Sequence, residues 1–400
     1  MDHVLWSIGH ELIFDNIVRA EKSYLYDSNG KKYLDLESGI WCTAVGHSNP
    51  RLTKIIKDQV DKIIHVGYCY ANPVIEESAK AIVSILDFKD GKCVFLNSGS
   101  EAVEFGVQAA QSILEKPFIL TFSDSYYGSY GSVNKRPEKE WTSFDWLSNC
   151  SNCSCMDSCN KNCEKFKKMQ FDKINCFLFE PGSSSGLVRF PPKKLVQNIC
   201  REVKENNGLL IMNEITTGIG RTGKWFGFQH YDIQPDIVAI GKSIGGGYPV
   251  SITAVSKGVA EILPTKSFKY AQSHMNDPLG ASVAKEMIQI IIDENLISRG
   301  NKVGTELIKQ LNELKKKNPI IKEIRGRGLM IAIVINDDEQ NVRTAYIYQE
   351  LLNHGIIVAR RPNLNVFRID PALTIPEVDI CEFINCFEQV LQQCSIKFNQ

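Results

Sequence analysis

The residue with the clearest capacity for chemistry is a single lysine, Lys242, at the end of an apolar run. The run VAIG (238–241) precedes it, and three glycines follow at positions 245–247. A charged amine at the end of a buried strand is unfavourable unless it is paired or takes part in chemistry. Burial lowers the pKa of a lysine, and the neutral amine is then a nucleophile that can form a Schiff base. The alternative is a surface lysine in a strand-to-loop turn, and the position alone leaves both open.

A short turn of small residues is the second chemical feature. In LNSGSEAVEFGVQ (96–108), Ser98, Gly99 and Ser100 lie between an apolar run and a helical pattern. Small residues there let backbone N–H groups approach an anion at the positive end of a helix. Ser98 followed by Glu101 also fits a capping box, which does no more than begin a helix. The turn is therefore a candidate phosphate site, with a plain capped helix as the alternative.

The elements that must position these residues are predicted by five apolar runs. The runs are CVFLN (93–97), FILTF (118–122), CFLFE (176–180), LLIMNE (209–214) and IVAIG (237–241). Continuous apolar runs suit parallel strands that helices cover on both faces. Between two of them, PKKLVQNICREVKENNG (192–208) has the apolar spacing of a helix that ends near its Asn-Asn-Gly. Strand, helix and strand in alternation predict an α/β sheet, which binds ligands at the carboxyl ends of its strands.

The two ends of the chain have a different pattern. Residues 22–38 contain period-two segments around DSNG, which predicts a hairpin. An amphipathic helix, a strand, a further helix and two short strands follow residue 295. We therefore expect residues 1–48 and 296–400 to form a smaller α+β domain. Residues 49–295 should form a large α/β domain with a mostly parallel central sheet sandwiched by helices, in which the irregular stretch 134–168 is a surface insertion.

Charge and composition exclude several classes of partner. The chain has 400 residues, with 46 basic and 46 acidic side chains. This balance argues against nucleic acid or an anionic membrane as a partner. The apolar runs are too short to span a bilayer, and the first 16 residues lack the pattern of a secretory signal. We expect a cytoplasmic protein.

Five of the thirteen cysteines lie close together. They are Cys150, Cys153, Cys155, Cys159 and Cys163. In a reducing compartment such a cluster is expected to hold thiols or metal ligands rather than disulfides. Four thiolates could bind a structural zinc ion and hold the loop in place. Free or redox-active thiols are the alternative, and an iron–sulfur cluster is a third, although the spacings match no common iron–sulfur motif.

On longer segments the sequence resembles a known family. GIWCTAVGHSNPRL (39–52), VFRIDPALTIPEVDI (366–380) and above all MNEITTGIGRTGKWFGFQHYDIQPDIVAIGKSIGGGYPVS (212–251) resemble the class III aminotransferases. These are pyridoxal-phosphate enzymes of fold type I, and they include ornithine, acetylornithine and ω-amino acid aminotransferases. The resemblance implies an enzyme that transfers an amino group from an amine or amino acid to a keto acid. It also implies a homodimer with active sites at the interface.

The resemblance assigns roles to individual residues. It implies that Lys242 holds the cofactor as a Schiff base and moves the proton. It places the cofactor ring between an aromatic residue, Tyr126 with Tyr127 beside it, and Ile215. It implies that Ser273 reaches the phosphate of the neighbouring subunit. The residues expected to bind the cofactor are Ser98, Gly99, Ser100, Tyr126, Tyr127, Asn213, Ile215, Thr216, Lys242 and Ser273.

One departure from the family concerns the electronic state of the cofactor. Asn213 stands where the family has an aspartate that pairs with the ring nitrogen and keeps it protonated. An amide carries no charge and can only donate to that nitrogen or accept from it. Glu214 is not expected to substitute, because adjacent residues of a strand face opposite ways. We expect slower amino transfer. Racemisation, epimerisation or an aminomutase reaction is the alternative, and loss of activity is a third outcome.

Other departures concern the substrate and the ring contacts. Ser185 replaces a family glutamate that pairs with a substrate-binding arginine, matched here by Arg368. We therefore expect Arg368 to be a free guanidinium that binds a substrate carboxylate. The alternative is that it pairs with Asp370 or another acid. Trp41 matches the bulky wall of the substrate pocket, or else it is core. Thr216 replaces a glutamine that bonds the phenolic oxygen of the ring.

Overall fold

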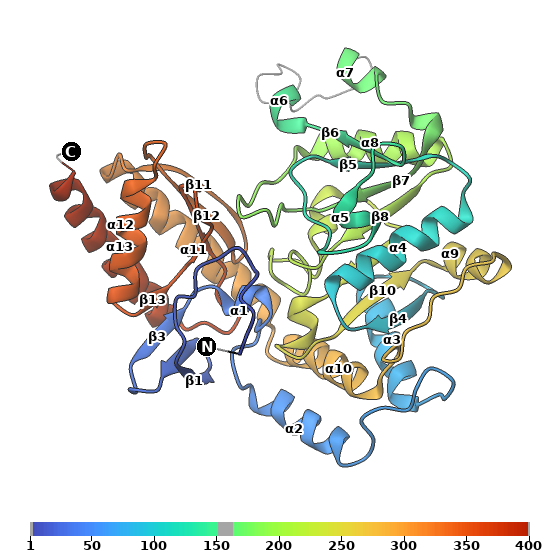
Figure 1. The fold of residues 1–400 in the computed structure, drawn as a ribbon, viewed down its shortest axis with the longest axis horizontal. Helices are drawn as coiled ribbons and strands as arrows, with labels where there is room; N and C mark the ends of the chain where they lie inside the picture. Colours follow the sequence, from blue (N-terminus) through green and yellow to red (C-terminus); the bar gives the residue numbers. More distant parts are fainter. Residues whose placement is uncertain (1–2, 151–162, 399–400) are drawn as a thin grey trace. The chain divides into compact units, whose positions relative to one another are not determined.

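The computed structural model describes residues 3–150 and 163–398, and it divides into two compact units. The larger unit comprises residues 50–185 and 189–294, and the smaller comprises residues 1–49, 186–188 and 295–400. Figure 1 shows that each unit has its own sheets and helices. The expected boundaries lay at residues 48–49 and 295–296, and the sequence did not suggest that residues 186–188 belong with the small unit.

The large unit is built around a seven-stranded sheet with strand order β4-β10-β9-β8-β7-β5-β6. Its strands are β4 (Lys92–Leu96), β5 (Phe118–Phe122), β6 (Trp141–Phe144), β7 (Ile174–Phe179), β8 (Leu209–Asn213), β9 (Ile237–Ile240) and β10 (Ser251–Val255). The neighbours from β6 to β9 pair in parallel, and β10 runs antiparallel to both β9 and β4. The expected mostly parallel central sheet is therefore confirmed.

Helices cover the sheet, and this explains the continuous apolar runs. The longer helices of this unit are α2 (Pro50–Val60), α3 (Pro73–Ile85), α4 (Gly99–Ile113), α8 (Lys193–Glu205) and α10 (Pro278–Asp293). The shorter ones are α5 (Ser132–Lys135), α6 (Trp146–Cys150), α7 (Glu164–Lys167), α9 (Lys257–Ile262), η2 (Phe171–Lys173), η3 (Gly227–Tyr231), η4 (Lys242–Gly245) and η5 (Leu263–Thr265). All six residues of β7 and all four of β9 are buried, as strands with two covered faces require.

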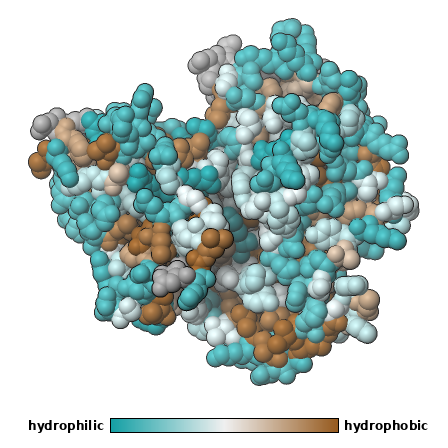
Figure 2. Space-filling view, viewed as in Figure 1, coloured by the Kyte–Doolittle hydropathy of each residue, from teal (hydrophilic) through white to brown (hydrophobic). Residues whose placement is uncertain are grey.

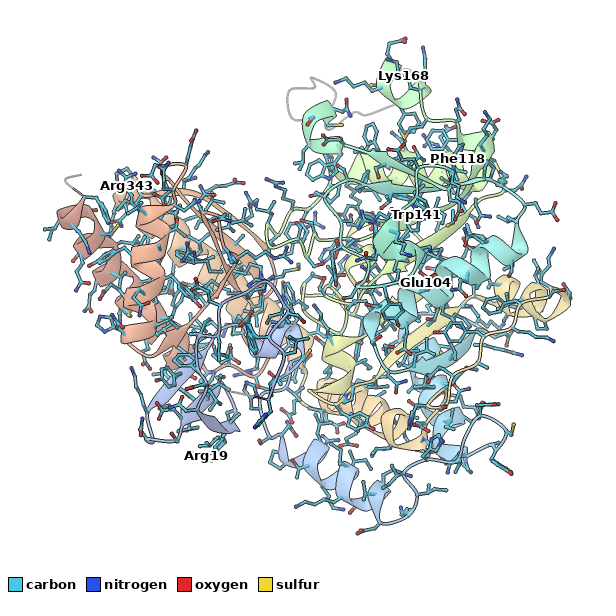
Figure 3. All side chains as sticks on the ribbon, in the orientation of Figure 1. Arg19, Glu104, Phe118, Trp141, Lys168 and Arg343 are labelled. Carbon is cyan, nitrogen blue, oxygen red and sulfur yellow. The ribbon has the colours of Figure 1, made fainter. Side chains whose placement is uncertain are left out.

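The stretch 134–168 was expected to be a surface insertion, and for part of it that is wrong. Residues 141–144 form β6, which pairs in parallel with β5 at the edge of the sheet. Trp141, marked in Figure 3, and Phe144 are buried against the sheet. The sequence does not predict this strand, because only two of its four residues are apolar. Cys150 and Cys163 belong to the described residues, whereas Cys153, Cys155 and Cys159 lie outside them.

The small unit is an α+β structure made from both ends of the chain. One sheet contains β1 (Ile17–Glu21), β2 (Tyr24–Asp27), β3 (Lys32–Asp35) and β13 (Ile356–Ile357). The other contains β11 (Ile321–Arg327), β12 (Met330–Ile335), β15 (Val366–Ile369) and β14 (Ala359–Arg360). Its helices are α1 (Ser38–Trp41), α11 (Leu296–Lys317), α12 (Val342–Asn353) and α13 (Glu377–Lys397). The predicted hairpin is confirmed as β2 and β3, and β3 pairs in parallel with β13.

Among the described residues, no helix combines the length and the apolar character needed to cross a bilayer.

Candidate active site

Lys242 lies in a strained turn at the carboxyl end of β9. It follows Gly241 directly and opens η4, and its φ is +45°. A non-glycine residue in this left-handed region costs about 1–2 kcal/mol, so the surrounding structure must hold it there. Its side chain is half-buried. The interpretation of Lys242 as an ordinary surface lysine therefore loses support.

The end of the neighbouring strand brings Asn213 to the same edge of the sheet. Asn213 is the last residue of β8, and it pairs with Ala239 of β9. The Glu214 N–H continues this pairing by donating to the Ala239 carbonyl at 2.8 Å. The side chain of Asn213 is buried, with 2% exposure. Parallel strands end at one edge of a sheet, so the topology places Asn213 and Lys242 on the edge where α/β sheets bind ligands.

Ile215 connects the turn at 98–100 with the turn that holds Lys242. A methyl group on Gly99 would lie 2.9 Å from Ile215 Cγ2. One on Gly241 would lie 3.0 Å from Ile215 Cδ1 and 3.5 Å from Gly99 Cα. Three segments far apart in sequence are therefore in contact, and only glycine fits at two of the contact points without displacing a neighbour.

Replacing Gly99 by alanine tests this packing. We expect the added methyl group to displace Ile215 and to weaken cofactor binding about tenfold, the usual effect of an overpacked contact. Gly258→Ala is the matched control, because a methyl group there would meet nothing within 4 Å. The measurement is the fraction of cofactor retained after dialysis, with the apparent Tm of each variant as the check on folding. Equal retention by both variants would contradict the prediction.

The turn at 98–100 is a capping box and a helix N-terminus at once. Ser98 Oγ accepts a hydrogen bond from the Glu101 N–H at 3.3 Å, and Glu101 Oε2 accepts one from the Ser98 N–H at 2.7 Å. The capping alternative is therefore confirmed. It does not exclude an anion, because the N–H groups of Gly99 and Ser100 open a 15-residue helix and have no partner within it. Ser100 Oγ accepts from the Ser129 N–H at 3.0 Å.

The two adjacent tyrosines face different environments. Tyr126 is 45% exposed, and its hydroxyl shares a hydrogen bond with Ser129 Oγ at 2.8 Å. Tyr127 is 2% exposed, and its hydroxyl donates to the Leu178 carbonyl at 2.8 Å. The Arg136 guanidinium lies 4.7 Å from the centre of the Tyr127 ring. The Tyr127 ring is enclosed in the core, which gives no support to its expected contact with the cofactor, and that contact stays a prediction.

Thr216 has the property expected of a residue that meets a bound polar group. Its side chain is 3% exposed, and among the described residues its hydroxyl has no hydrogen-bond partner. An unsatisfied buried hydroxyl costs about 1–3 kcal/mol. Together with the helix N-terminus at Gly99 and the amine of Lys242, it fits a phosphorylated aldehyde cofactor with polar ring substituents. Ser273 is exposed in the segment before α10, and its role toward a second subunit stays a prediction.

Two buried carboxylates, Glu180 and Glu214, hold loops of the large unit, a role that the sequence did not suggest. Glu214 accepts hydrogen bonds from Thr217 Oγ1 at 2.6 Å, the Gly227 N–H at 2.8 Å and the Phe228 N–H at 2.7 Å. Glu180 accepts from the Tyr126 N–H at 3.2 Å. Burial raises the pKa of each carboxyl to about 7, although the hydrogen bonds act in the opposite direction. The signal was present in the sequence, since an acid ends each of two buried strands.

In the small unit, the expectation of a free Arg368 is wrong. Its side chain is 7% exposed, with Nη2 3.6 Å from Glu37 Oε1 and Nε 3.3 Å from Asp370 Oδ2. Its Cζ lies 3.8 Å from the centre of the Trp41 ring. Burial explains the difference, because a guanidinium removed from water requires compensating charge, and two carboxylates supply it. Trp41 is 2% exposed, which supports the alternative that it is a core residue.

The turn that carries Trp41 has an unusual backbone. Ser38, Gly39, Ile40 and Trp41 have φ values of +49°, +54°, +59° and +67°. Asp35 stabilises this left-handed turn by accepting the N–H groups of residues 37, 38 and 39 at 2.8, 3.0 and 3.3 Å. His47 Nε2 lies 2.8 Å from the same carboxylate. Neither Asp35 nor His47 was expected to matter, because Asp35 binds mainly backbone N–H groups and His47 lies 12 residues away from it, so no short side-chain motif reveals either residue.

Comparison with known proteins agrees with the geometry. The model of the family "Aminotransferase class-III" matches residues 7–391. A leucine/methionine racemase of Thermococcus litoralis is 27% identical, and the match covers 94% of this chain and 90% of the racemase. An acetylornithine/succinyldiaminopimelate aminotransferase of Buchnera aphidicola is 30% identical, and the match covers 94% of this chain and 93% of that protein. The crystal structure of acetylornithine aminotransferase from Elizabethkingia anophelis has a TM-score of 0.82 to this chain. The two sequences are 25% identical, and the match covers 97% of this chain and 96% of that one. The chain therefore belongs to the class III aminotransferases, which are pyridoxal-phosphate-dependent transferases of fold type I.

Proposed function

We propose that the residues at the carboxyl edge of the large sheet form the amino-transfer site, with Lys242 as its catalytic residue. The observation that carries the proposal is the strained left-handed turn at Lys242, beside the contact of Gly99, Ile215 and Gly241. When bound, pyridoxal phosphate supplies an aldehyde that condenses with amines and a ring that withdraws electrons from them. Lys242 would hold this group as a Schiff base and then take and return the substrate proton.

The other residues of the site bind and orient. The first N–H groups of α4, at Gly99 and Ser100, favour the phosphate through the positive end of the helix. Tyr126 and Ile215 present an aromatic and an aliphatic side chain, which suit the two faces of a planar ring. The Thr216 hydroxyl offers a hydrogen bond to a polar ring substituent. Since Arg368 is neutralised by two acids, we do not assign it to the substrate carboxylate.

Racemisation or epimerisation of an amino acid is a second candidate, and the amide of Asn213 favours it. Without a charged partner, the ring withdraws electrons less strongly, so the proton that Lys242 removes returns more readily to the carbon it left. One relative of similar length is named a leucine/methionine racemase, and another acts on acetylornithine by its name. Both names support an amino acid as the substrate class.

One experiment separates the two candidates. The holoenzyme is incubated in deuterated water with a panel of amines and amino acids, without a keto acid. Amino transfer leaves the cofactor in its amine form, whereas racemisation inverts the substrate, labels its α-carbon and leaves the cofactor spectrum unchanged. We expect a discharged cofactor with at least one donor, and some α-deuteration. If no donor converts the cofactor to its amine form and no substrate gains deuterium, both candidates are contradicted.

We also propose that the protein acts as a homodimer to which Ser273 contributes across the interface. The end of α2 and the segment after it expose several large apolar side chains, and Figure 2 shows apolar surface in the lower part of the view, around the end of α2. The residues are Val60, Ile64, Tyr68 and Tyr70, which are 41–73% exposed. Exposed apolar clusters commonly mark protein contacts. A cytoplasmic location, zinc at the cysteine cluster and the absence of nucleic-acid and membrane partners remain predictions from the sequence.

A further inference from the structure

We propose that Asn213 is an amide because it forms one arm of a clamp on the Tyr126 peptide group. This clamp excludes an ionised carboxylate at position 213, so a cofactor ring bound here keeps its nitrogen without a proton. The second part of the inference rests on the proposed cofactor site. The clamp itself is a property of the chain alone.

The hydrogen bonds of Asn213 determine which way its amide points. Nδ2 donates to the Tyr126 carbonyl at 3.0 Å, and Oδ1 accepts from the Ile215 N–H at 3.2 Å. One partner is an obligatory acceptor and the other an obligatory donor, so the opposite orientation would break both bonds. The side chain is 2% exposed, and water cannot replace either partner.

The second arm of the clamp is Glu180. Its Oε2 accepts from the Tyr126 N–H at 3.2 Å, and its Oε1 accepts from the Ser184 N–H at 3.2 Å. Glu180 is 2% exposed, so both polar groups of the Tyr126 backbone bond to buried side chains from β8 and from the end of β7. The Tyr126 ring remains 45% exposed. The clamp therefore positions the aromatic residue that we assign to the cofactor ring.

An aspartate of the same shape cannot form the Asn213 arm. Its carboxylate would place an oxygen 3.0 Å from the Tyr126 carbonyl oxygen, with no hydrogen between two acceptors. The charge would also be buried beside this dipole. The acid could restore the bond only by binding a proton, which then points at the Tyr126 carbonyl. Position 213 thus requires a neutral donor for a reason independent of catalysis.

The consequence for the cofactor follows from charge. A carboxylate beside a ring nitrogen raises the pKa of that nitrogen and keeps it protonated. The amide has one remaining N–H and one remaining lone pair, and neither attracts a proton as a full negative charge does. The ring nitrogen therefore stays unprotonated near neutral pH. Lys242 is then the group that must hold the substrate proton, as the racemisation candidate also requires.

The clamp is tested on the protein without cofactor. We compare the apparent Tm of the wild type, Asn213→Asp and Asn213→Leu at pH 5 and pH 8. Asn213→Leu removes both bonds and should lower Tm equally at both pH values. Asn213→Asp should have a smaller deficit at pH 5, where the folded acid is protonated, than at pH 8, where the deficit relative to the wild type should be larger by at least about 2 °C. A deficit of Asn213→Asp that is equal at both pH values would overturn the clamp.

The state of the ring is tested separately by ¹⁵N NMR of protein loaded with cofactor that is ¹⁵N-labelled at the ring nitrogen. We expect the wild type to show the resonance of an unprotonated nitrogen from pH 6 to pH 9. A protonated nitrogen in this range would overturn the second part of the proposal. If the protein binds no cofactor, the proposed function fails, whereas the Tm comparison still decides the clamp.

Discussion

Lys242→Ala should not attach the cofactor covalently, and its kcat/KM for amino transfer should fall by about four orders of magnitude. Alanine can neither form a Schiff base nor carry a proton, and both steps are assigned to the same amine. The expected loss is near the upper end of that for a general acid–base residue, because one substitution removes two functions. The measurements are reduction with borohydride followed by mass spectrometry, and steady-state kinetics with the best donor from the panel.

Two controls separate this loss from misfolding. Alanine keeps the left-handed backbone strain of position 242, where φ is +45°, so the apparent Tm should stay close to that of the wild type. Lys224→Ala removes an exposed lysine of the same long matched segment, and it should retain covalent cofactor and activity. Added methylamine should restore part of the rate of Lys242→Ala. Covalent cofactor in Lys242→Ala would show that another lysine holds it.

The second large effect is a loss of stability as pH rises. Burial raises the pKa of Glu180 and of Glu214 to about 7. A carboxyl whose folded pKa lies above its unfolded value stabilises the fold fully below the unfolded value, near 4.5, and this contribution is lost as pH rises through about 7. Each group should therefore lower the free energy of unfolding by about 3 kcal/mol between pH 5 and pH 8.

Denaturation with urea at pH 5, 6, 7 and 8 measures this effect. Glu180→Gln and Glu214→Gln should each flatten the dependence, because glutamine keeps an acceptor oxygen and does not titrate. Glu313→Gln is the control, since Glu313 lies on the exposed face of α11 beside Lys316. It should leave the slope unchanged. The same slope in all three variants would show that these buried acids do not control stability.

Much of the large unit could be predicted because its signals are local. Apolar runs predict strands with two covered faces, and the chain order of strands and helices restricts the sheet to few topologies. The position of Lys242 at the carboxyl edge follows from that topology. Strand β6 could not be predicted in this way, because two buried residues in four carry too little pattern, and pairing with β5 supplies the rest.

The side chains with wrong or incomplete predictions share one cause, namely partners that lie far away in sequence. Tyr126 and Tyr127 are alike as a motif, yet only the fold shows that the Tyr127 hydroxyl bonds to Leu178 in the core. The family glutamate expected beside Arg368 is replaced by Ser185, but in the fold Glu37 and Asp370 lie beside the guanidinium instead. A buried charge is compensated by whichever groups surround it, and a sequence motif does not contain that information.

The sequence by itself determined the class of enzyme and the absence of an acid at position 213, and it singled out Lys242 as the lysine that we propose to be catalytic. These depend on residue types and on short-range order along the chain. Only the tertiary structure decided what the amide of Asn213 does, because its partners are a carbonyl 87 residues away and a nearby N–H. Hydrogen bonds to backbone atoms leave no signature in residue types, since every residue except proline offers the same two groups.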